Sequence, residues 1–170
     1  MDNAALVLWL LTAGGGLTMA AIWLVRGGLR QRDEVLELSY PDVARATDVT
    51  GGTPAPQRSR LPAWMISTHA GLAVLGLIFW LFYVGHEGEK GTGIDALPPL
   101  VVVLLVVVAS IGALMVRRWR DDRRRLAADG VPKADRPPEQ RFPVLVVAMH
   151  GLLAVVTFAL VFLTAVGVGD

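Results

Sequence analysis

Residues 142–169 read FPVLVVAMHGLLAVVTFALVFLTAVGVG, a stretch without Asp, Glu, Lys or Arg that carries one histidine, His150. Crossing about 30 Å of hydrocarbon takes about 20 helical residues at 1.5 Å each, so this stretch is long enough to span a bilayer. In lipid, each backbone N–H and C=O must find its partner within the segment, which requires a helix. The stretch therefore predicts a transmembrane helix.

Three further stretches have the same character, because residues 4–25, 61–85 and 96–116 also lack charged side chains. Charged residues make up 18% of the 170-residue chain, whereas a soluble domain carries about 25%. The acidic start of the chain, with no small-residue cleavage site after the first stretch, favours a retained helix over a signal peptide. The absence of cysteine excludes disulfides and cysteine-ligated metals.

We therefore expect an all-α fold, a single integral membrane domain over residues 1–170 that forms an up-down bundle of four transmembrane helices. The helices are expected at about 4–26, 61–85, 96–117 and 142–167, with long loops at about 27–60 and 118–141.

The basic residues indicate the orientation of the bundle. Of 16 Lys and Arg residues, six lie in residues 26–60 and nine in residues 117–141. The positive-inside rule then predicts cytoplasmic long loops, with both termini outside. The high Ala, Val, Gly and Arg content is typical of a bacterium with a GC-rich genome, and hence predicts the bacterial cytoplasmic (inner) membrane. The basic run at 117–125 is interpreted as a topology signal, with attraction of anionic lipid as the alternative. Its interleaved acids argue against nucleic-acid binding.

The loops and the tryptophans give further local predictions. Residues 38–62 are rich in Pro, Gly, Ser and Thr and are expected to have little fixed structure, after a short amphipathic helix at Gln31–Leu38. The third helix is expected to continue past the membrane and to break at Asp129-Gly130. The tryptophans near the predicted boundaries are interpreted as aromatic belts at the two lipid interfaces. These are Trp23, Trp64 and Trp119 on the inner side and Trp80 on the outer side.

Two of the apolar stretches resemble each other. Residues 60–75 read RLPAWMISTHAGLAVL and residues 141–156 read RFPVLVVAMHGLLAVV, with six identical positions in sixteen. Each has Arg, then Pro two residues on, then His seven residues after the Pro. Pro fits the first turn of a helix because it has no N–H to leave unsatisfied. The pattern, with a Val-Arg pair ending both the first and the third stretch, favours tandem duplication of a two-helix hairpin.

The paired histidines, His69 and His150, suggest a cofactor site. Both are expected about 10 Å deep, because seven helical residues separate each from its Pro. Axial ligation of haem b needs two imidazoles facing each other across a porphyrin. The diagonal of a four-helix bundle, about 11–14 Å for interaxial distances of about 8–10 Å, accepts such a group. The histidine placement and helix count resemble those of small membrane b-type cytochromes, which implies a redox or electron-transfer protein or complex subunit.

Four further residues are expected to contact the haem or to line its pocket, because of their position relative to the histidines. Arg60 and Arg141 lie at a suitable height to contact haem propionates, and seven-residue steps from the histidines place Gly76 and Thr157 on the same helix faces. These faces are small or polar, and Gly14 to Gly16, Ala109, Ser110 and Gly112 are also small residues within the spans. Small residues let helices approach closely, or make room for a flat ligand.

Alternative interpretations remain open. Each histidine alone can donate one interhelical hydrogen bond, worth about 0.6–2 kcal/mol, in a cofactor-free structural or accessory subunit that assembles with other membrane subunits or with a second copy of itself. A proton-sharing pair is another possibility, as is a copper site with Met65 or Met149. Zinc is disfavoured because the spans hold no carboxylate to complete its ligand set. No hydrolase or nucleotide-binding motif is present.

Overall fold

The computed structural model describes residues 2–29, 59–86 and 94–168. It contains four long helices, α1 (Asp2–Val25), α4 (Ala63–Gly85), α5 (Leu97–Ala128) and α6 (Val144–Ala165). Short 3₁₀ turns lie at η2 (Ile94–Ala96), η3 (Lys133–Asp135) and η4 (Pro138–Arg141). Each long helix is long and apolar enough to cross a membrane. The prediction of an all-α membrane protein with four spanning helices is confirmed.

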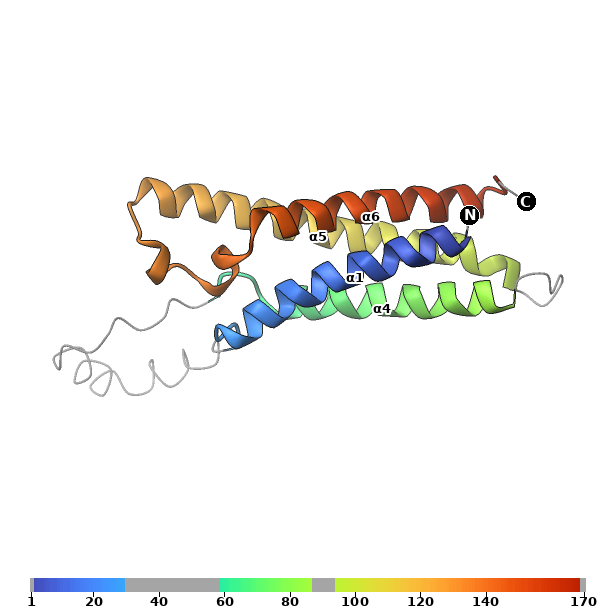
Figure 1. The fold of residues 1–170 in the computed structure, drawn as a ribbon, viewed down its shortest axis with the longest axis horizontal. Coiled ribbons are helices and arrows are strands. Elements are labelled where there is room, and N and C mark those ends of the chain that lie inside the picture. Colours follow the sequence, from blue (N-terminus) through green and yellow to red (C-terminus); the bar gives the residue numbers. More distant parts are fainter. Residues whose placement is uncertain (1, 30–58, 87–93, 169–170) are drawn as a thin grey trace.

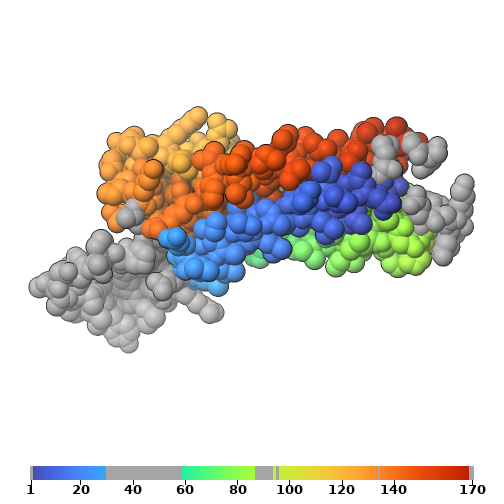
Figure 2. Space-filling model, viewed as in Figure 1, coloured from blue at the N-terminus to red at the C-terminus, as the bar shows by residue number. Residues whose placement is uncertain are grey.

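The four helices run side by side along the long axis of the molecule (Figures 1 and 2). α1 packs mainly against α6 and α4 mainly against α5, while smaller contacts of α5 with α6 and of α1 with α4 complete the ring. α4 and α6 are therefore diagonal neighbours. The start of α1 and the end of α6 lie together at what we call the terminal end (Figure 1). The opposite end, which carries residues 117–141, is called the basic end.

The helix boundaries follow the local sequence. Pro62 (φ −60°, ψ 133°) and Pro143 (φ −60°, ψ 125°) are the extended N-cap residues of α4 and α6. Each Pro thus lies one residue before its helix, rather than in the first turn as predicted. α5 ends at Ala128 with Asp129 as its C-cap residue, and the next residue, Gly130, adopts φ 68°. Only glycine adopts this left-handed conformation at little steric cost. The predicted break at Asp129-Gly130 is confirmed.

α5 continues well beyond the membrane span. Its 32 residues are about 48 Å long at 1.5 Å each, against about 30 Å of hydrocarbon. Its basic segment therefore projects past the other helices (Figure 1), as the sequence predicted. The predicted helix at Gln31–Leu38 and most of the predicted loop over residues 38–62 lie outside the described residues.

The tightly packed core lies toward the terminal end. It is formed by Ala5, Trp9, Trp80, Val101 and Val161, which are buried between all four helices. At the same end, the Thr164 hydroxyl donates a hydrogen bond of 2.8 Å to the Asp2 carboxylate, and the Asp2 backbone carbonyl accepts one from Trp80 Nε1. This half of the bundle is therefore held by packing and by buried hydrogen bonds.

Most tryptophans do not form lipid-facing belts. Trp23, Trp80 and Trp119 are at most 7% exposed, whereas Trp64 is 64% exposed. The buried indoles donate hydrogen bonds within the protein, for example from Trp23 Nε1 to Ser59 Oγ (2.8 Å) and from Trp119 Nε1 to the Glu139 carbonyl (2.9 Å). The belt prediction is wrong for these three residues. An indole whose N–H reaches an acceptor inside the protein can bury its large apolar surface without leaving that N–H unpaired.

Candidate functional site

The structure brings His69 and His150 together although 81 residues separate them. Their ring centroids are 6.2 Å apart and their planes are inclined by 59°. His69 lies on α4 and His150 on α6, the two diagonal helices, so the two rings approach each other across the bundle. Both residues are half-buried.

Each imidazole is held by a backbone carbonyl of a neighbouring helix. His150 Nδ1 lies 2.8 Å from the carbonyl oxygen of Thr12 on α1, and His69 Nδ1 lies 3.0 Å from that of Val108 on α5. A carbonyl oxygen can only accept, so Nδ1 must carry the proton in both rings. In the neutral imidazole this leaves the lone pair on Nε2.

A glycine makes each of these contacts possible. Gly16 and Gly112 lie four residues after Thr12 and Val108, one helical turn further along the same face. A Cβ atom at Gly16 would lie 3.2 Å from Cε1 of His150, and one at Gly112 would lie 3.1 Å from Cε1 of His69. The small residues of these helices thus accommodate the imidazole rings. The sequence pointed to glycines in the right region, but did not indicate which of them face a histidine.

The two halves of the bundle repeat the same set of contacts. Thr12 and Gly16 of α1 correspond to Val108 and Gly112 of α5 at a spacing of 96 residues, since each pair holds one histidine. The buried Trp23 and Trp119 have the same spacing. The Val-Arg pairs noted in the sequence are 91 residues apart and are therefore out of this register.

The residues predicted for the pocket face are buried, but their surroundings differ. A Cβ atom at Gly76 would lie 3.1 Å from the Trp9 ring, so an indole occupies that side of α4. Thr157 is 2% exposed, and its hydroxyl has no hydrogen-bond partner among the described residues. Other hydroxyls in the spans bond to the carbonyl four residues back, namely those of Thr12, Thr18, Ser67 and Ser110. Thr157 thus presents an unsatisfied polar group inside the bundle.

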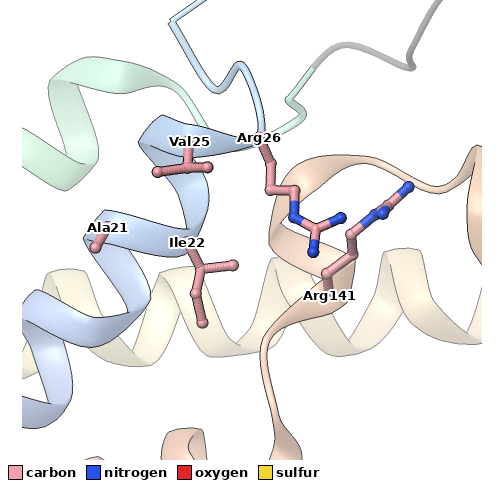
Figure 3. A pocket seen from close by; sticks show the side chains of 5 residues that line it. All are labelled: Ala21, Ile22, Val25, Arg26 and Arg141. Atoms are coloured by element: carbon pink, nitrogen blue, oxygen red, sulfur yellow. The ribbon is translucent and has the colours of Figure 1, made fainter.

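The two arginines predicted to contact propionates have different environments. Arg60 pairs with Asp122 of α5 (Nη1 to Oδ1, 3.2 Å), and its backbone N–H donates to Glu139 Oε1 at 2.7 Å. Arg141 instead lines a cavity of about 340 Å³ together with Arg26 (Figure 3). Only Arg141 therefore lies at an opening of the bundle that a ligand could enter.

The remaining candidate ligands lie elsewhere. His86 follows the last turn of α4, where its Nδ1 lies 2.9 Å from the Phe82 carbonyl oxygen. The Met65 sulfur accepts a hydrogen bond from Arg118 Nη1 at 3.2 Å. Within residues 2–29, 59–86 and 94–168, no group of three or more His, Cys, Asp or Glu residues could hold a metal ion. In this part of the chain the histidine pair is therefore the candidate site, and it offers two protein ligands.

Comparison of the chain with protein-family models, with curated proteins and with solved structures found no match. Its function is therefore inferred from the geometry of the histidine pair.

Proposed function

We propose that this chain is an integral membrane haem protein in which Nε2 of His69 and Nε2 of His150 bind one haem b iron from opposite faces. It would act in electron transfer, alone or as a subunit of a membrane redox complex. The observation that carries the proposal is the approach of two imidazoles, from diagonal helices, with both Nδ1 atoms already engaged.

The separation of the rings supports this assignment. A metal–imidazole bond is about 2.0–2.1 Å long, and the ring centroid lies about 1 Å further from the metal along the same line. Two imidazoles on opposite sides of one metal ion therefore have centroids about 6 Å apart, and the observed separation is 6.2 Å. Two independent interhelical hydrogen bonds would not require the rings to meet at this distance.

The hydrogen bonds at Nδ1 also support it. Metal-binding histidines almost always donate their other N–H to a carbonyl, a carboxylate or water, which fixes the tautomer and the ring orientation. His69 and His150 both have such a donor contact to a helix carbonyl. The protein would thus hold both ligand nitrogens ready before iron binds.

The buried hydroxyl of Thr157 offers a further polar contact on the face that contains His150. Neither predicted arginine is assigned to a propionate, because the Arg60 side chain is paired with Asp122 and Arg141 lines a separate cavity at the basic end. A haem with two histidine ligands supplies one-electron transfer, since neither axial position is open. In this chain, the four helices supply the orientation of the ligands and the exclusion of water.

The basic segments would face the cytoplasm of a bacterial cell by the positive-inside rule. The duplication of a two-helix unit is supported by the recurrence of the His–carbonyl–Gly contact in both halves. A duplicated hairpin would supply two equivalent histidines, one from each half, as a pair of ligands to one iron.

The test is the difference spectrum of the purified full-length protein, reduced with dithionite minus air-oxidised. We expect an α-band at about 560 nm, as for b-type haem. His69→Ala and His150→Ala should each abolish it, and His86→Ala is the matched control that should retain it. A variant that misfolds is recognised by its elution profile, and His150→Gly with added imidazole should recover the band if the loss is one of ligation.

Absence of the band from protein expressed with ample haem would refute the proposal. So would a band that survives both His69→Ala and His150→Ala. In the first case a cofactor-free accessory subunit, with the histidines serving as interhelical hydrogen-bond donors, would be the remaining function. In the second case haem would be bound by residues other than this pair.

A further inference from the structure

A cavity of about 340 Å³ opens at the basic end of the bundle, away from the histidine pair. Its walls come from the last turns of α1 and from the end of η4, which packs against α1. Arg26 lies about 15 Å beyond Gly16 along the chain, since ten helical residues separate them. The lining residues are Ala21, Ile22, Val25, Arg26 and Arg141.

The lining divides into an apolar wall and a cationic rim. The apolar side chains are those of the final turns of a membrane-spanning helix, and Val25 is 85% exposed in the isolated chain. Arg26 is the first charged residue after this span. Both arginines line the cavity, and Figure 3 shows their side chains on the same side of Ile22. In a bilayer the wall would therefore lie at the level of the lipid tails and the arginines at the level of the headgroups.

We propose that this cavity binds one anionic phospholipid, with its phosphate between Arg26 and Arg141 and an acyl chain along Ala21, Ile22 and Val25. Guanidinium groups present a planar fork that matches phosphate oxygens. Basic pockets at the ends of membrane helices are suited to such headgroups. A free phosphate would use the arginines but not the apolar wall, and a zwitterionic lipid would bring its own cation to the rim.

The bound lipid would join two parts of the chain. Arg26 follows α1, whereas Arg141 directly precedes α6, the helix that carries His150. A phosphate held by both would stabilise the packing of α1 against α6 at the basic end.

The proposal is tested on the full-length protein in neutral detergent. Binding of phosphatidylglycerol, phosphatidylcholine and inorganic phosphate is compared by native mass spectrometry and by the shift in Tm. We expect retention of phosphatidylglycerol and a rise in Tm with that lipid. Arg26→Gln and Arg141→Gln should each weaken its binding about fivefold, and the double variant about 25-fold.

A matched control is the double variant Arg120→Gln/Arg124→Gln, which removes the same charge from exposed positions of α5 outside the cavity. It should leave phosphatidylglycerol binding unchanged, and an equal loss would overturn the proposal in favour of diffuse attraction. Ala21→Trp, which fills the apolar wall but keeps both arginines, should weaken lipid binding. Inorganic phosphate that raises Tm as much as phosphatidylglycerol would also overturn the proposal.

The difference spectrum separates this site from the proposed haem site. The double variant Arg26→Gln/Arg141→Gln should lose lipid binding and keep the band at about 560 nm expected for b-type haem. A variant that loses the band and still binds phosphatidylglycerol would show that the arginines serve haem instead.

Discussion

Alanine at Gly16 or Gly112 should destabilise the protein, because each added Cβ meets an imidazole that cannot easily move. The new atom would lie 3.2 Å from Cε1 of His150, or 3.1 Å from Cε1 of His69, closer than ordinary van der Waals contact of about 3.5–4.0 Å. His150 is held by its hydrogen bond to Thr12 on one side and by the second ring on the other. The ring must therefore tilt and lengthen that bond.

Three contributions set the expected change in the free energy of unfolding. Overpacking costs about 1–3 kcal/mol, and loss of the interhelical hydrogen bond costs about 0.6–1.7 kcal/mol. Alanine regains about 1 kcal/mol over glycine in a helix. The net loss in the free energy of unfolding is then about 1–4 kcal/mol for each substitution.

Gly14→Ala is the matched control, because no atom lies within 4 Å of a Cβ built at that position of the same helix. It should leave stability unchanged or raise it by up to about 1 kcal/mol. The helix-propensity gain cancels in the comparison, so Gly16→Ala should fall below Gly14→Ala by about 2–5 kcal/mol. Gly71→Ala is a second control, on α4, because no atom lies within 4 Å of a Cβ built there.

The assay is reversible unfolding of the purified protein in mixed micelles with increasing denaturing detergent, followed by circular dichroism. Equal midpoints for Gly16→Ala and Gly14→Ala would refute the reasoning, because the imidazole would then give way at no cost and would not be constrained as described.

Two further predictions concern buried carboxylates and use the same assay. Glu139 is 1% exposed and accepts a hydrogen bond from the backbone N–H of Arg60 at 2.7 Å. Glu139→Ala should therefore lower the free energy of unfolding by about 1–3 kcal/mol, because it leaves that N–H unpaired. Glu139→Gln keeps an acceptor and should lose less, and equal losses for the two variants would contradict this role. Thr164→Val should cost about 1.5–3 kcal/mol because it removes a hydrogen bond to a charged group, the Asp2 carboxylate. Thr164→Ser retains the hydroxyl and should lose less, and a Val variant as stable as the Ser variant would refute the contact.

The site was only partly predictable from the sequence. The shared Arg-Pro-His spacing identified His69 and His150, because all three residue types are rare in apolar runs. The equivalent Arg60 and Arg141 nevertheless have different surroundings, since Arg60 pairs with Asp122 of α5 whereas Arg141 lines a cavity together with Arg26. The tryptophans were misjudged for a similar reason: an indole near a membrane boundary faces lipid or protein according to whether an acceptor such as Ser59 lies beside it.

The sequence by itself determined the four helices, the projecting end of α5 and the end of that helix just before Gly130. These depend on local quantities, namely the length of an apolar run, the need for backbone hydrogen bonds within lipid, and the conformational freedom of one glycine. Only the tertiary structure decided which helix faces which, and hence that Gly16 and Gly112 lie against the imidazoles while Gly14 does not. Helical periodicity gives the direction in which each side chain points around the helix axis. Which neighbouring helix lies in that direction is set by packing between segments far apart in the chain.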